Sequence, residues 1–194
     1  LIGQELDDYQ ETRPLALKLF EQGVSEDVSR NQIQYSPIVR LIKIYTEVGR
    51  KDDARDILLK NLKPKSIDYY DQDYQLAMLV QNKFWAAEQF AAMGYPLDAL
   101  TLYQELSGED SSLSRAASWN GDSVEGLKRR IATGLNSSIE AVSQTDPDAA
   151  MSQLLAVPEE LTPGQPVFDL MLSVNPIDAG EYEEMSSRFI KVLQ

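Results

Sequence analysis

The segment FWAAEQFAAMGYPLDALTLYQEL, residues 84–106, decides the fold of this chain. Apolar residues at helical spacing lead to Gly94, and a second stretch with the same spacing begins directly after it. Glycine readily adopts the left-handed conformation that ends a helix, so the pattern predicts two helices joined by a tight turn. Phe90 lies four residues before this glycine, while Ala99 and Tyr103 lie five and nine residues after it.

A second segment, YSPIVRLIKIYTEVGRKDDARDILLKNL at residues 35–62, repeats this arrangement around Gly49. Tyr45 lies four residues before the glycine, Ala54 five residues after it and Leu58 nine residues after it. Small residues at fixed offsets let two helices approach closely, and large residues fill the space beside them. The two matching segments predict an all-α fold built as an array of helical hairpins.

Helical periodicity continues along most of the remaining chain, and no segment shows the alternation typical of a strand. Gly23 is expected to end the first helix, and the polar residues 21–34 are interpreted as a loop or as a poorly packed helix. The serine-rich residues 107–121 are expected to form a loop. Asp122 and Glu125 resemble a capping box, and Asp146 is expected to cap the helix that follows. The predicted helices cover residues 14–22, 37–48, 52–63, 71–93, 97–106, 122–142, 147–157, 167–173 and 179–192.

We interpret residues 1–110 as helical hairpins and residues 111–194 as further helices packed on the same array, so that the chain forms one continuous domain. The chain begins LIGQELDD, without an initiator Met, and we expect it to be a fragment of a longer protein. No run approaches the roughly 18 apolar residues of a membrane span. The compartment stays open because a chain without cysteine suits either redox environment.

The net charge of −13 is concentrated toward the C-terminus, where residues 135–194 carry 10 acidic and only 2 basic side chains. Such a field repels phosphate polyanions, so nucleic acids and anionic membranes are not expected partners. The basic run at residues 128–130 is interpreted as a solvated helix face, with a local acidic contact as the alternative.

The absence of cysteine and histidine excludes several kinds of catalysis. Without them the chain has no thiolate nucleophile, no imidazole base and no site of the usual zinc type. Carboxylate-pair and Ser–Lys chemistry survive this exclusion, but no motif for either is recognisable. We therefore predict no catalytic residues, no metal site and no cofactor.

The two hairpins resemble the tetratricopeptide repeat, a family of helical-hairpin proteins. The unit around Gly94 matches the pattern of that family at Ala87, Phe90, Gly94, Ala99 and Tyr103. In the unit around Gly49, Ile42 replaces the small residue of the family and Leu58 replaces its second aromatic residue. The glycines are 45 residues apart, whereas the family repeats about every 34 residues. The resemblance therefore implies a divergent tetratricopeptide-like superhelix.

This resemblance implies that the first helix of each hairpin lines a partner-binding groove. The candidate groove residues are Val39, Lys43, Glu47, Phe84 and Glu88. Packing in the core is the alternative interpretation for Phe84. The family's clamp for a peptide carboxylate requires Lys and Asn where this chain has Val39 and Lys43, so such peptide tails are not expected ligands.

The expected function is that of a protein-interaction or scaffolding module that binds a protein or peptide and is not an enzyme. Two alternatives stay open. One is a carboxylate-dependent all-α enzyme fragment, such as a glycan hydrolase or lyase, which would require two carboxylates about 5–10 Å apart in a cleft. The other is a structural segment that forms a homo-oligomer, which would bury more than about 1,000 Å² against a second copy.

Overall fold

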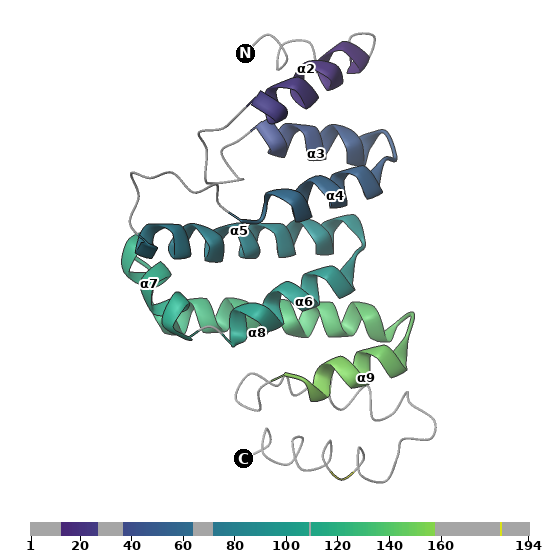
Figure 1. Cartoon of the computed structure of the whole chain (residues 1–194). Helices are drawn as coiled ribbons and strands as arrows, with labels where there is room; N and C mark the ends of the chain where they lie inside the picture. The colour runs from purple at the N-terminus through teal and green to yellow at the C-terminus, as the bar shows by residue number, and fades with distance from the viewer. Residues whose placement is uncertain (1–12, 27–36, 64–71, 109, 158–182, 184–194) are drawn as a thin grey trace. The chain divides into compact units, whose positions relative to one another are not determined.

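The computed structural model describes residues 13–26, 37–63, 72–108, 110–157 and 183 (Figure 1). All regular structure in these ranges is helical, which confirms the all-α prediction. Ser36, the loop before α5 and the predicted helices at 167–173 and 179–192 lie almost entirely outside the described residues.

The chain divides into two compact units, residues 1–86 and 87–194, and the division falls inside helix α5 (Gln72–Met93). The long helix predicted at residues 71–93 is confirmed, because the apolar stripe carries it without interruption.

In the first unit, α3 packs against both α2 and α4. The bounds of these helices are Arg13–Glu26 for α2, Pro37–Glu47 for α3 and Lys51–Asn61 for α4. Because α3 has a neighbour on two sides, nearly half of it is buried, at Ile38, Leu41, Ile42, Ile44 and Tyr45. The carbonyl of Leu62, at the end of α4, accepts a hydrogen bond from the Asn82 side chain at 3.2 Å, which satisfies one of the unpaired groups of a helix end.

In the second unit, α8 packs against α6, α7 and α9. The bounds of these helices are Pro96–Ser107 for α6, Asp110–Asn120 for α7, Val124–Ser143 for α8 and Pro147–Leu155 for α9. The stripe predicted on α8 is buried except for its first member, at Leu127, Ile131, Leu135, Ile139 and Val142. Gly134 lies inside this helix, so the prediction of one long helix is confirmed.

Three local predictions were wrong. Residues 110–120 form α7 and not a loop, because Leu113, Ala116 and Ala117 make a buried stripe on one side of the serine-rich segment. Helix α2 continues through Gly23 to Glu26, since a single glycine costs a helix only about 1 kcal/mol. The cap of α8 is Ser123, whose side chain accepts from the Gly126 N–H at 3.0 Å, and not Asp122.

Candidate interaction surface

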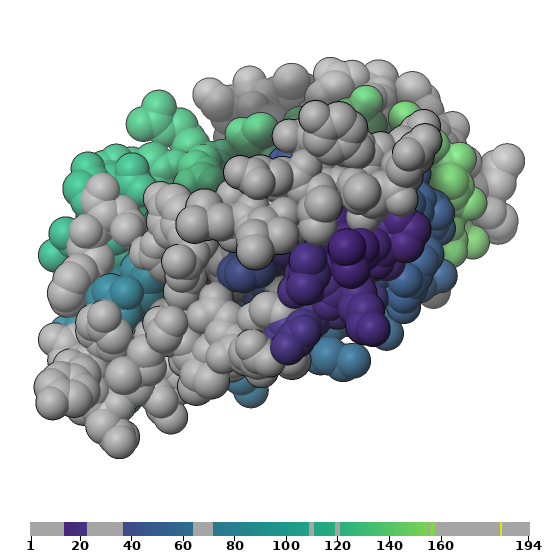
Figure 2. Space-filling model, turned by 90° about the horizontal axis from the view of Figure 1, so that it is seen from above, coloured from purple at the N-terminus to yellow at the C-terminus, as the bar shows by residue number. Residues whose placement is uncertain are grey.

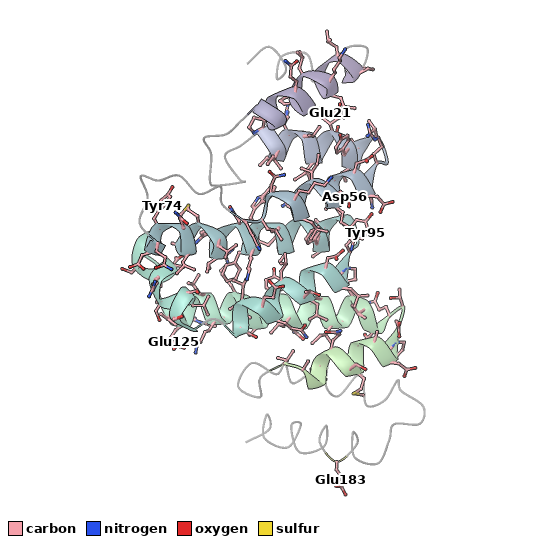
Figure 3. All side chains as sticks on the ribbon, viewed as in Figure 1. Glu21, Asp56, Tyr74, Tyr95, Glu125 and Glu183 are labelled. Carbon is pink, nitrogen blue, oxygen red and sulfur yellow. The ribbon has the colours of Figure 1, made fainter. Side chains whose placement is uncertain are left out.

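Gly49 and Gly94 close the first two hairpins with the same backbone geometry. Both are left-handed, with φ of +78° and +87°, and each N–H donates to the carbonyl three residues earlier, at 3.2 and 3.1 Å. The N–H groups of Arg50 and Tyr95 donate to the carbonyls five residues earlier, at 2.7 and 2.8 Å. Tyr95 lies at the turn between α5 and α6 (Figure 3). These bonds define a Schellman motif, so the repetition in sequence extends to the hydrogen bonds.

The hairpin of α8 and α9 shares the core positions of the other two but lacks the glycine. Asp146 precedes α9 as Arg50 precedes α4 and Tyr95 precedes α6. Four and eight residues after these positions the buried pairs are Ala54 and Leu58, Ala99 and Tyr103, and Ala150 and Leu154. The N–H of Asp146 donates to a carbonyl four residues earlier and not five, so this turn is closed by a different hydrogen bond. Its side chain accepts from the Ala149 N–H at 3.0 Å, which confirms the predicted cap.

Three of the candidate groove residues lie on α3 at intervals of four, so they share one face of the helix. Val39 is half-buried, whereas Lys43 and Glu47 are exposed. The ammonium group of Lys43 lies 3.8 Å from a carboxylate oxygen of Glu47. The exposed face of α3 therefore carries two opposite charges on adjacent helical turns.

In the second unit, Glu88 on α5 forms an ion pair with Arg130 on α8. Glu88 Oε1 accepts a hydrogen bond from Arg130 Nη2 at 2.8 Å, and both side chains are about half exposed, at 49% and 46%. For Arg130, this confirms the acidic contact that was the alternative interpretation of the basic run. The pair joins the first helices of two successive hairpins at the surface of this unit.

Tyr103 and Gly134 lie beneath this ion pair. Burial raises the pKa of Tyr103, and the Glu88 carboxylate raises it further while Arg130 lowers it. A Cβ atom added at Gly134 would overlap three atoms of the Tyr103 ring, so the backbone of α8 touches the aromatic face directly. The absence of a side chain at Gly134 thus lets α6 and α8 approach closely.

Phe84 is only 1% exposed and belongs to the core, which is the alternative given for it above. It offers no surface to a partner. Ala91 and Ala92, one turn beyond Glu88, are exposed, and so are Thr133, Ser137 and Ala141 on α8. Small exposed residues therefore follow the ion pair along both helices.

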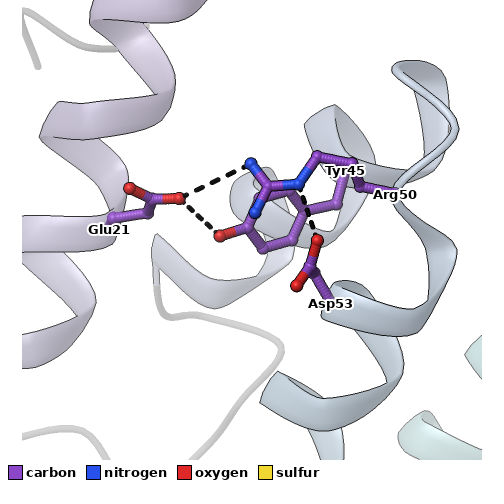
Figure 4. A network of polar contacts seen from close by, with 4 residues as sticks. All are labelled: Glu21, Tyr45, Arg50 and Asp53. Atoms are coloured by element: carbon purple, nitrogen blue, oxygen red, sulfur yellow. Dashed lines mark hydrogen bonds and ion pairs between the residues drawn. The ribbon is translucent and has the colours of Figure 1, made fainter.

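A second polar cluster, which sequence analysis missed, connects α2 with the hairpin of α3 and α4 (Figure 4). The Tyr45 hydroxyl donates to Glu21 Oε1 at 2.6 Å, and Arg50 Nη1 lies 3.9 Å from the same oxygen. The Arg50 guanidinium lies 4.4 Å from the centroid of the Tyr45 ring and donates to Asp53 Oδ2 at 2.6 Å. A cation above a tyrosine face is attracted by the ring as well as by the carboxylates. Only the pair of Arg50 and Asp53, three residues apart, was accessible to sequence reasoning.

Burial raises the pKa of Tyr45 to about 12 from an ordinary value of 10.0, and the hydrogen bond to Glu21 contributes to the rise. The folded protein holds the hydroxyl proton of Tyr45 more tightly than the unfolded chain does. The contribution of Tyr45 to the free energy of unfolding is therefore fully present below pH 10. We expect that contribution to be lost as the pH rises from about 10 to about 12. Urea denaturation across this range should show a steeper loss of stability in the native protein than in Tyr45→Phe. Parallel curves for the two proteins would contradict the assignment.

Comparison with protein-family models, with curated proteins and with solved structures yields no match. Within the described ranges, no helix is both long enough and apolar enough to cross a membrane. The same residues contain no group of three acidic side chains that could hold a metal ion.

Proposed function

We propose that this chain is a protein-interaction or scaffolding module, built as a tetratricopeptide-like array of helical hairpins and without catalytic activity of its own. The observation that carries the proposal is the 2.8 Å contact between Glu88 and Arg130. It brings the exposed faces of α5 and α8 together, so that two hairpins contribute to one surface.

The composition of this surface supports the proposal. Beside the ion pair, the exposed positions are small, at Ala91, Ala92, Thr133, Ser137 and Ala141. Small side chains let the backbone of a bound peptide approach two helices, and the charged pair supplies a donor and an acceptor that fix its orientation. In the first unit, Lys43 and Glu47 offer the same two kinds of group on the exposed face of α3.

The decisive experiment places a bulky charge on this surface without changing the core. Ala92→Arg and Ser137→Arg alter exposed positions on α5 and α8, and Thr101→Arg on α6 is the matched control. We expect a partner captured from lysate by the native chain to bind Ala92→Arg and Ser137→Arg at least about tenfold more weakly. The Lys43/Glu47/Glu88 triple alanine variant tests the charged groups in the same assay.

Circular dichroism should show unchanged helix content in each variant, so that loss of binding is not loss of fold. The control Thr101→Arg should bind as the native chain does. Equal capture by the native chain, Ala92→Arg and Ser137→Arg would place the interface elsewhere and contradict the proposal.

A further inference from the structure

Few of the described side chains of helix α2 are buried. Among its described side chains, at residues 14–22, only Ala16 and Phe20 are buried. Leu15 and Leu19 are 52% and 37% exposed, on the side of the helix that faces solvent. Figure 2 shows side chains of α2, in purple, on the surface of the molecule. A helix of 14 residues is marginally stable alone in water, so α2 depends on its contacts with the hairpin.

Two polar contacts between α2 and the hairpin converge on a single oxygen atom. Glu21 Oε1 accepts from the Tyr45 hydroxyl at 2.6 Å and lies 3.9 Å from Arg50 Nη1. Arg50 is held in place independently by Asp53 at 2.6 Å and by the ring of Tyr45 at 4.4 Å. The hairpin therefore presents two fixed donors, and Glu21 of α2 supplies a carboxylate oxygen that meets both.

We infer that α2 docks reversibly on α3, and that the contact of Glu21 with Tyr45 and Arg50 is the latch that holds it. Glu21 and Arg50 are each more than 40% exposed, so dissolved salt screens their attraction. Opening of the latch would release α2 alone, because the hairpin of α3 and α4 keeps its own buried residues and its own turn. The inference goes beyond the proposed function and does not depend on any partner.

Native-state hydrogen exchange, measured peptide by peptide on the full chain, tests this inference. In Glu21→Gln and in Tyr45→Phe, we expect the amides of α2 to exchange about 5- to 20-fold faster than in the native protein. Amides of α3 and α6 should exchange at their native rates. Raising sodium chloride from about 0.05 M to about 0.5 M should accelerate the exchange of the α2 amides in the native protein but not in Glu21→Gln.

Lys18→Gln is the matched control, because Lys18 is an exposed charged residue on the same helix. Its α2 amides should exchange at the native rate. Native α2 rates in both Glu21→Gln and Tyr45→Phe would overturn the inference. So would equal acceleration of α3, because α2 would then open only when the whole unit unfolds.

Discussion

Replacement of Gly134 by alanine is expected to lower the free energy of unfolding by about 1–3 kcal/mol. On an exposed helix the same change is stabilising by about 1 kcal/mol, because alanine is the better helix former. Here the new Cβ would overlap the ring of Tyr103, which is only 6% exposed and has little room to move. Overpacking therefore outweighs helix propensity. Urea denaturation followed by circular dichroism measures the change.

A double-mutant cycle with Tyr103→Leu separates this clash from any general effect of alanine in α8. With the ring removed, Gly134→Ala should be neutral or stabilising, which gives a coupling energy of about 2 kcal/mol. Thr133→Ala, at the exposed neighbouring position, should change stability by less than about 0.5 kcal/mol. A Gly134→Ala protein as stable as the native one would show that α6 and α8 do not approach closely at this point.

Replacement of Phe90 by alanine should have the largest effect, a loss of about 3–5 kcal/mol. Phe90 is 0% exposed, and its backbone carbonyl accepts the 2.8 Å bond that closes the turn at Gly94. Removal of the ring leaves a cavity next to that turn, and both the lost burial and the cavity destabilise the fold. Since domains are typically stable by only about 5–15 kcal/mol, the variant should be partly unfolded at 37 °C. Thermal denaturation provides the measurement.

Leu97→Ala is the control for this prediction, because Leu97 lies in the same hairpin but is 48% exposed. Leu97→Ala should lower the free energy of unfolding by less than about 1 kcal/mol, as expected for a side chain that is only partly buried. Phe90→Leu keeps most of the buried volume, so its loss of stability should lie between those of Leu97→Ala and Phe90→Ala. Similar losses in Leu97→Ala and Phe90→Ala would contradict the assignment of Phe90 to the core.

The parts of the fold that were predictable depend on short-range signals. Gly49 and Gly94 mark their turns because a left-handed residue is required there, and the aspartate at 146 caps the helix that begins with the next residue. The continuous apolar stripe of α8 correctly predicted one helix that includes Gly134. The residues that decide the two turns and the cap lie within about two helical turns of one another, and successive members of the α8 stripe lie about one turn apart.

The candidate surface and the latch depend on contacts that periodicity does not reveal. Arg130 and Glu88 are 42 residues apart, and Tyr45 and Glu21 are 24 residues apart. Helix α7 was missed because its serines mask a stripe that becomes apparent only when α6 and α8 cover it.

The short turn between α8 and α9 makes this chain simple to label. Among the described residues, a positive φ occurs only at Gly49, Gly94 and Gly121, so this turn accepts any ordinary side chain. Gln144 is exposed there with φ of −70°, and the sequence contains no cysteine. Gln144→Cys would therefore create a single reactive thiol. A fluorophore attached to it would report on binding at the adjacent surface without disturbing either glycine turn.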